Sequence, residues 1–209
     1  MAGVRDIAEA LLLDLDGPLR VFDPSVASTV ELEYALPAGA LGAAAFAWPR
    51  LRPAIVGEVS HDEWMAGVVE DLVPVAGGQE RAALAVAEWQ RYRGDVSATM
   101  LRFIREVRRG GIPVGLATNA TNRLDDDLAE LALIREVDVV VNSSVLGVHK
   151  PAKEFFLAAC QAIGRPPGKV LFLDDEDRNI RGARAAGLSA HRWTSVDDLP
   201  YLRAALNLR

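Results

Sequence analysis

The stretch LLLDLDGPLRVFD, residues 11–23, places two aspartates one residue apart at the end of a strongly hydrophobic run. In an extended strand, residues two apart point to the same side, so Asp14 and Asp16 are expected to point toward one place where the strand ends. Gly17 then allows an abrupt turn of the chain. We therefore predict a buried strand over residues 10–15 with two acids at its carboxyl end.

Four more apolar runs follow in the second half of the chain, at residues 112–118, 137–142, 169–174 and 188–193. Segments with helix-like composition alternate with them, at residues 121–132, 152–163, 177–186 and 197–207. Strands that are nearly continuous apolar runs are typical of a sheet that helices cover on both faces. The alternation predicts an α/β fold with a Rossmann-like parallel sheet.

Residues 20–95 interrupt this alternation, because one crossover connection needs far fewer residues. The sequence SHDE at residues 60–63 has capping-box spacing, and Trp64, Val68 and Leu72 follow at helical spacing. Residues 23–34 and 79–92 also have helical composition. We predict a core domain over residues 1–19 and 96–209, with a small inserted α-helical cap domain over residues 20–95.

Composition and charge exclude several classes of protein. The chain has 209 residues, of which 50% are hydrophobic and 25% charged, values close to globular averages. Its net charge of -6 gives no general attraction to nucleic acid or anionic lipid. The small basic cluster Arg105, Arg108 and Arg109 is interpreted as a solvated helix face. We expect no nucleic-acid or membrane partner, and the oligomeric state stays open.

The location is expected to be cytoplasmic. Cys160 is the single cysteine, which excludes an intrachain disulfide and favours a reducing compartment. The start of the chain lacks the long apolar region of a signal peptide. The longest apolar run, residues 38–48, is too short to span a bilayer and is interpreted as buried.

Polar side chains follow the ends of four predicted strands or the loops after them. Asp14 and Asp16 follow the first strand. The others are Thr118, Asn119, Lys150, Asp174 and Asp175. Ligands of open α/β sheets bind at the carboxyl ends of the strands, so these groups are expected to share one crevice. Each residue alone is better explained as a turn or helix-cap residue, but the whole set at successive strand ends is not.

Four carboxylates in one crevice repel each other unless a cation or shared protons are present. Oxygen ligands without histidine or thiolate favour a hard ion, and Mg²⁺ keeps waters that a phosphate can replace. Lys150 adds a compact positive charge suited to a phosphate. The set predicts Mg²⁺-assisted phosphoryl transfer.

At this point the sequence resembles the haloacid dehalogenase (HAD) superfamily of phosphohydrolases, subfamily I with a helical cap. The motifs that carry the resemblance are DLDG at residues 14–17, LATN at 116–119, KP at 150–151 and LDDEDRNIRGARAAG at 173–187. Any one of these motifs is weak, but four in this order and spacing are specific. The resemblance covers nearly the whole chain apart from details of the cap.

The resemblance implies a role for each matching residue. Asp14 looks like the nucleophile, and Asp16 like the general acid and base with its backbone carbonyl on Mg²⁺. Thr118 and Asn119 would hold the phosphoryl group, and Lys150 would stabilise its charge. The metal residues would be Asp14, Asp16, Asp174 and Asp175, of which Asp175 is the expected direct ligand of the acidic pair, with Asn179 in support.

The family name alone does not fix the reaction. Dehalogenases lack the second acid, here Asp16, and the phosphonate-cleaving branch needs a cap lysine, whereas the three lysines all lie outside residues 20–95. We therefore expect a Mg²⁺-dependent phosphatase of a small phosphorylated metabolite. A sugar phosphomutase, a catalytically silent HAD-like binding module and a receiver domain are the alternatives, the last disfavoured by the large insert.

The chain departs from the family pattern at several positions. Pro18 stands where Thr or Val is frequent, and Ala152 and Lys153 replace residues that often follow the KP pair. His149 precedes that pair and could touch substrate, although a surface position is expected. Arg50, Arg52 and His61 are cap residues that could meet substrate, although solvated positions are expected for each. The substrate itself stays open.

Overall fold

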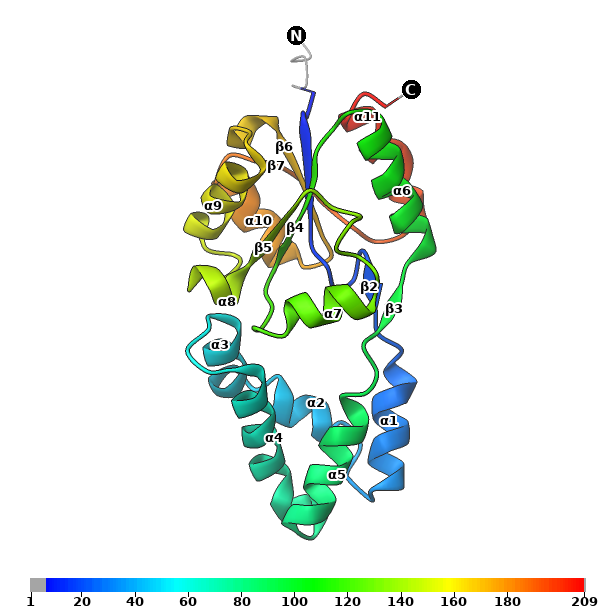
Figure 1. Cartoon of the computed structure of the whole chain (residues 1–209), viewed down its shortest axis with the longest axis vertical. Helices are drawn as coiled ribbons and strands as arrows, with labels where there is room; N and C mark the ends of the chain where they lie inside the picture. The colour runs from blue at the N-terminus through cyan, green and yellow to red at the C-terminus, as the bar shows by residue number, and fades with distance from the viewer. Residues whose placement is uncertain (1–6, 209) are drawn as a thin grey trace.

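Five parallel strands form the central sheet, in the order β5-β4-β1-β6-β7 (Figure 1). The computed structural model describes residues 7–208, so the first six residues of the predicted core segment 1–19, and Arg209, lie outside the described residues. The strands are β1 (Ala10–Leu13), β4 (Val114–Thr118), β5 (Val139–Asn142), β6 (Val170–Asp174) and β7 (Ser189–Arg192). Each lies within a run that the sequence predicted, and the predicted α/β fold with a parallel sheet is confirmed.

The central strand β1 is buried on both faces, which explains its apolar sequence. Leu11 and Leu13 pack on one face with α6 (Ala98–Arg109), α7 (Leu124–Glu130) and α11 (Leu199–Ala205). Ala10 and Leu12 pack on the other face with α9 (Lys153–Ile163) and α10 (Asp177–Ala185). Because burial fixes which way each residue of β1 points, it also fixes where Asp14 emerges from the strand.

Helix boundaries follow local chemistry. At the start of α6 the Ser97 side chain accepts a hydrogen bond from the Met100 backbone N–H, and Met100, Ile104 and Val107 then bury one face. Arg108 and Arg109 occupy its last turn, where positive charge suits the helix dipole. The remaining short elements of the core are α8 (Ser143–Leu146), η1 (Pro167–Lys169) and η2 (Val196–Asp198).

Five of the helices between β1 and β4 lie beyond the carboxyl ends of the strands, where residues of four of them form a separate buried cluster (Figure 1). They are α1 (Pro24–Glu33), α2 (Ala40–Ala45), α3 (Trp48–Ile55), α4 (His61–Ala76) and α5 (Gln79–Trp89), here called the cap. The predicted capping box of α4 is present, since Ser60 and Glu63 exchange side-chain and backbone hydrogen bonds. The same helix ends at Gly77, whose φ of 74° is left-handed.

The apolar run 38–48 is only partly buried, so its interpretation as a buried segment is wrong at its end. Leu41 and Ala45 are buried in the cap cluster, but Phe46 is 60% and Trp48 46% exposed. Helix α2 stops at Phe46, so the residues after it do not continue the buried face. They line the cavity described below.

Two short antiparallel strands, β2 (Arg20–Val21) and β3 (Asp95–Val96), bring the two ends of the insert together. They lie at the boundaries predicted for the cap, although the division into two domains itself stays a prediction. Within residues 7–208, no helix is long and apolar enough to cross a membrane.

Candidate active site

Lys150 lies between two acids that come from different strands. Its Nζ is 2.9 Å from Asp14 Oδ2, just after β1, and 2.7 Å from Asp174 Oδ2, at the end of β6. The Lys150 and Asp174 side chains are fully buried, and Asp14 is 8% exposed. A buried ammonium with two carboxylates at hydrogen-bond distance is a tightly paired site, as burial of these charges requires.

The pKa values at this site reflect the balance between burial and pairing. Burial raises the pKa of the Asp14 carboxyl to about 7, although Lys150 acts in the opposite direction. Burial disfavours the charged form of Lys150, but Asp14 and Asp174 outweigh it and raise the pKa of the ammonium. Lys150 is therefore a fixed positive charge at neutral pH.

Hydrogen bonds fix the orientation of the two acids. The Leu15 backbone N–H donates to Asp14 Oδ1 at 2.8 Å, and the Glu176 backbone N–H donates to Asp174 Oδ1 at 2.8 Å. Asn179, on α10, donates to both oxygens of Asp174 at 3.1 and 3.0 Å. The support predicted for Asn179 thus reaches the site through Asp174.

The predicted phosphate residues lie on the neighbouring strand. Thr118 ends β4 and is 1% exposed. The side chain of Asn119 bridges to the next loop, because its Oδ1 accepts from the Lys150 backbone N–H at 2.8 Å and its Nδ2 donates to the Lys150 carbonyl at 3.1 Å. Asn119 therefore fixes the loop that carries Lys150.

Three of the predicted metal residues form a group that fits a hard cation. Asp14, Asp174 and Asp175 each offer a carboxylate oxygen, and these oxygens lie within 4.8 Å of one another. Burial and the charge of Asp174 raise the pKa of Asp175, as expected of acids that share a site. Oxygen donors without nitrogen or sulfur fit Mg²⁺ better than zinc or copper.

Gly17 lets the Asp175 carboxylate approach the turn after β1. Its φ is 88°, and a Cβ at this position would lie 2.3 Å from Asp175 Oδ2. The turn is closed by bonds from the Gly17, Leu19 and Arg20 backbone N–H groups. Pro18, which lacks an N–H, therefore fits between Gly17 and Leu19 without loss of these bonds.

Asp16 does not belong to the group of three acids. Its carboxylate faces Arg20, with Nε–Oδ1 and Nη2–Oδ2 distances of 2.5 and 3.1 Å. Arg20 is 6% exposed and also donates from Nη1 to Asp127 at 3.0 Å. The metal contact expected from the backbone carbonyl of Asp16 stays a prediction.

A cavity of about 290 Å³ is lined by residues of the cap and of the core, among them Asp16 and Asn119. Six aromatic side chains line it, namely Phe22, Phe46, Trp48, Trp64, Trp89 and Tyr92. It also contains Arg20, Arg93, Arg123 and Asp127. This position places the cavity beside the buried acids, on the side of the cap.

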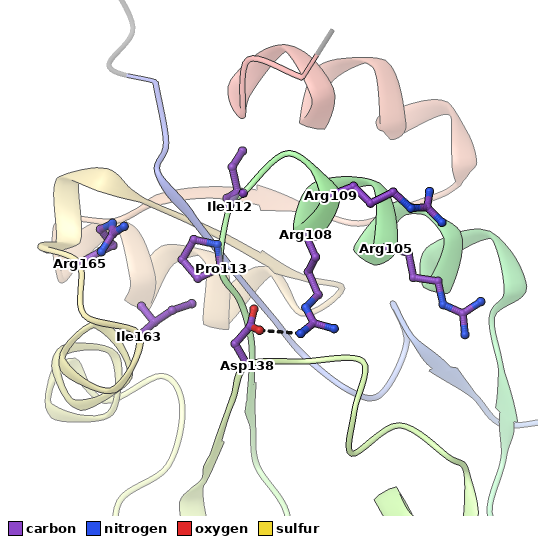
Figure 2. A pocket seen from close by; sticks show the side chains of 9 residues that line it. Arg105, Arg108, Arg109, Ile112, Pro113, Asp138, Ile163 and Arg165 are labelled. Atoms are coloured by element: carbon purple, nitrogen blue, oxygen red, sulfur yellow. Dashed lines mark hydrogen bonds and ion pairs between the residues drawn. The ribbon is translucent and has the colours of Figure 1, made fainter.

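A second, more open cavity of about 710 Å³ contains the basic cluster of the sequence analysis together with Arg165 (Figure 2). Its arginines are exposed or half-buried and largely ion-paired, because Arg105 contacts Glu136 at 2.6 Å and Arg108 contacts Asp138 at 2.7 Å. These exposed ion pairs agree with the prediction that the cluster lies on a solvated helix face. None of the predicted site residues lines this cavity.

The cap residues singled out from the sequence differ in position. Arg50 pairs with Asp71 and Arg52 with Glu58 on the exposed surface of the cap, as expected. The solvated position expected for His61 is wrong, since this residue is 6% exposed and lines the cavity. A single histidine beside a capping serine gives no signal of burial, which depends on packing between the cap and the core.

His149 contacts the cap. Its Nδ1 lies 2.6 Å from the Lys150 carbonyl, and its ring meets Trp48 edge-to-face with centroids 5.3 Å apart. His149 is half-buried rather than fully exposed at the surface.

The sequence reasoning missed the cavity arginines and most of the aromatic residues. Three of the four tryptophans, Trp48, Trp64 and Trp89, fall within residues 20–95, and this concentration is the one signal that could have indicated a cavity in the cap. Arg20, Arg93 and Asp127 come from distant parts of the chain, and no spacing relates them.

Comparison with known proteins agrees with the motif analysis. A family model of haloacid dehalogenase-like hydrolases matches residues 8–187. A phosphatase of Mycobacterium tuberculosis, MT3486, is 34% identical over 90 residues, which cover 42% of each chain. The phosphoserine phosphatase of Thermus thermophilus is 30% identical over 128 residues, which cover 59% of this chain and 51% of that protein. The matches thus span about half the length of these relatives.

A solved structure supports the fold over nearly the whole chain. A HAD family enzyme from Bacteroides thetaiotaomicron, in complex with magnesium and inorganic phosphate, superposes with a TM-score of 0.72 at 19% identity. The match covers 93% of this chain and 98% of that chain. The four sequence motifs, the parallel sheet and the family model agree: the chain belongs to the haloacid dehalogenase-like hydrolases.

Proposed function

We propose that the protein is a Mg²⁺-dependent phosphatase that hydrolyses a small phosphorylated metabolite through an aspartyl-phosphate on Asp14. The observation that carries the proposal is the fully buried Lys150 between Asp14 and Asp174, next to Asp175. Three carboxylates around one ammonium suit a divalent cation and a phosphate dianion together. Relatives named as phosphatases in Mycobacterium tuberculosis and Thermus thermophilus support the choice of a phosphate ester.

In the first step, an oxygen of Asp14 attacks phosphorus, and the bond from phosphorus to the ester oxygen breaks. Asp16 donates a proton to the departing oxygen, which leaves as an alcohol. In this structure the Asp16 carboxylate faces Arg20, so we infer that its side chain turns toward the leaving group when substrate binds. The neighbouring cavity would receive that group.

In the second step, water attacks phosphorus and the bond from phosphorus to Asp14 breaks. Asp16, now ionised, accepts the proton of the attacking water, so the pair of steps regenerates both acids. Dividing one difficult displacement into two easier ones is what a covalent nucleophile contributes.

The other residues hold charge and position. Lys150 would stabilise the negative charge of the phosphoryl oxygens and orient Asp14, and Thr118 with the Asn119 backbone N–H would bind those oxygens. Asp14, Asp174 and Asp175 would hold Mg²⁺, which when bound offsets the charge of the phosphoryl group.

The direct test measures phosphate release from 4-nitrophenyl phosphate and from a panel of phosphorylated metabolites. We expect turnover with Mg²⁺, loss of turnover with excess EDTA and recovery when Mg²⁺ is restored. Asp14→Asn should abolish turnover, because the amide does not act as the nucleophile. Glu9→Gln is the matched control, because Glu9 is exposed and pairs with Arg165 and Lys169 away from the site.

The intermediate is tested separately. Acid quenching during turnover of a ³²P-labelled substrate should leave label on the wild-type chain, and hydroxylamine should remove it because an acyl phosphate is the bond formed. Turnover that persists in Asp14→Asn would refute the role of this residue. Absence of turnover of every substrate by the Mg²⁺-loaded protein would refute the proposed function.

A further inference from the structure

The cavity beside the acids is placed to receive the part of the substrate that leaves. Asp16 and Asn119 line it, whereas Asp14, Thr118 and Lys150 do not. Its volume of about 290 Å³ is therefore available to the leaving group rather than to the phosphoryl group. This volume lies at the small end of the range for ligand pockets, which is about 300–1,000 Å³.

Exposed aromatic side chains gather in this cavity. Within residues 7–208, Phe22, Phe46 and Trp48 are the phenylalanines and tryptophans classed as exposed, and all three line it. Their exposed fractions are 47%, 60% and 46%. Exposed apolar side chains are normal when scattered, but a group of large ones around one cavity marks a binding surface.

Four of the rings meet in two edge-to-face pairs. Phe22 and Tyr92, near the two ends of the insert, meet edge-to-face with centroids 5.9 Å apart. Phe46 and Trp89 meet in the same way at 6.3 Å on the cap side. A planar ring between these pairs would find the edge-to-face and offset contacts that aromatic groups prefer.

Several polar side chains of the cavity bind each other. His61 Nδ1 lies 3.2 Å from Thr121 Oγ1, and His61 Nε2 lies 2.8 Å from Gln90 Oε1. The same Gln90 oxygen accepts from Arg123 Nη1 at 3.1 Å. A leaving group rich in hydroxyls, such as a sugar, would have to replace these bonds, and a polar group left unpaired there is costly.

Four arginines and two acids line the cavity. Each of the four lies within ion-pair distance of a carboxylate; the pairs are Arg20–Asp16, Arg93–Glu130, Arg123–Asp127 and Arg178–Glu176. The Arg20 guanidinium also lies over the Phe22 ring, 5.0 Å from its centroid. Arg20, Arg93 and Arg123 share Asp127, and the buried Arg93 Nη1 and Arg123 Nε have no hydrogen-bond partner among the described residues.

From the exposed aromatic walls and the hydrogen bonds that already join His61, Thr121 and Gln90, we propose that the substrate is a phosphate monoester whose leaving group carries a small aromatic ring. The ring lies between the Phe22–Tyr92 and Phe46–Trp89 pairs, with Trp48 beside it. This proposal rests on the proposed phosphatase function and adds the class of substrate.

The experiment compares phosphate release from 2-phenylethyl phosphate, ethyl phosphate and phosphoglycolate by the full-length, Mg²⁺-loaded protein. All three are esters of alkyl oxygens, so contacts to the leaving group are the main difference between the first two. We expect kcat/KM for 2-phenylethyl phosphate to exceed that for each other ester at least tenfold, which corresponds to about 1.4 kcal/mol.

Variants locate the preference in the cavity. Phe46→Ala and Trp48→Ala should each reduce the ratio of kcat/KM for 2-phenylethyl phosphate to that for ethyl phosphate, and Trp48→Phe should retain most of it. Leu32→Ala is the matched control, because Leu32 is a cap residue that is 84% exposed and lies outside the cavity. Circular dichroism of each variant verifies that the cap helices are intact.

The outcomes separate the two proposals. Equal kcat/KM values for the three esters, or a preference for phosphoglycolate, would overturn the aromatic substrate class and leave the phosphatase function standing. An unchanged ratio in both Phe46→Ala and Trp48→Ala would also overturn it. Absence of phosphate release from all three esters and from 4-nitrophenyl phosphate would overturn both proposals.

Discussion

Lys150→Met tests whether the two buried acids depend on the ammonium between them. The Lys150 side chain is fully buried, and its Nζ is 2.9 Å from Asp14 and 2.7 Å from Asp174. Methionine has a similar length and no charge, so the change removes the cation and leaves the acids in place. Breaking a buried ion pair in this way typically costs about 3–5 kcal/mol, because a charge stays buried without a partner.

The loss should depend on pH. Burial already raises the pKa of Asp14 to about 7, above its value of 3.8 in an unfolded chain. The folded protein therefore binds more protons, and stability falls as pH rises between these two values. Without Lys150 the pKa of Asp14 rises further, so stability of the variant continues to fall above pH 7 where that of the wild type no longer does. The difference in free energy of unfolding between wild type and Lys150→Met should therefore widen from pH 6 to pH 8.5.

Urea unfolding followed by tryptophan fluorescence, in EDTA at both pH values, measures this difference. A loss of about 3–5 kcal/mol corresponds to a fall in Tm of roughly 6–20 °C for a chain of this size. Lys153→Met is the control, because Lys153 is exposed in α9 and its replacement should change the free energy of unfolding by no more than about 0.5 kcal/mol. A loss below about 1 kcal/mol in Lys150→Met at both pH values would refute the reasoning.

Three further changes test other contacts. Gly17→Ala should weaken Mg²⁺ binding measured by calorimetry, because the new Cβ would meet the Asp175 carboxylate. The positive φ at this position also costs a residue with a Cβ about 1–2 kcal/mol. Unchanged Mg²⁺ affinity would contradict this prediction. Arg20→Met should lower the free energy of unfolding by about 1.5–3 kcal/mol, since it breaks the bonds to Asp16 and Asp127, whereas Arg52→Met at an exposed pair should have little effect. Asp198→Asn should destabilise the chain by about 1–2 kcal/mol at pH 7, as a lost helix cap does. Burial opposes the charge of Asp198, but hydrogen bonds from Thr194, His191 and Ser195 outweigh it and lower the pKa of this carboxyl to about 2. The difference in free energy of unfolding between wild type and Asp198→Asn should therefore shrink as pH falls from about 4 to 2. A difference in urea unfolding that stays constant over this range would refute the prediction.

The sheet could be predicted because its strands are buried on both faces. A strand such as β6 (Val170–Asp174) has no solvated face, so its burial reads directly as a continuous apolar run. The acids at the strand ends could be predicted to meet for a related reason, since parallel strands end at one edge of the sheet. The structure places Asp14, Asp174 and Asp175 together there, while their roles in catalysis stay predictions.

Short elements gave no such signal. The strands β2 and β3 have two residues each, and α8 has four, so neither alternation nor helical periodicity can develop within them. Their geometry depends on contacts between distant segments, such as the pairing of Arg20 with Val96.

The cavity could not be predicted from the sequence, because a sequence does not distinguish exposed aromatic residues from buried ones. Phe46 and Trp48 belong to an apolar run, and hydrophobicity alone assigns such residues to a core. What exposes them is the end of α2 at Phe46, together with the position of the cap over the strand ends. In this fold the sheet fixes the acids, whereas the contact between cap and core determines which surface the leaving group meets. The residues of the candidate site can therefore be predicted from motifs, whereas the cavity that would select the substrate is lined by residues that only the folded chain brings together.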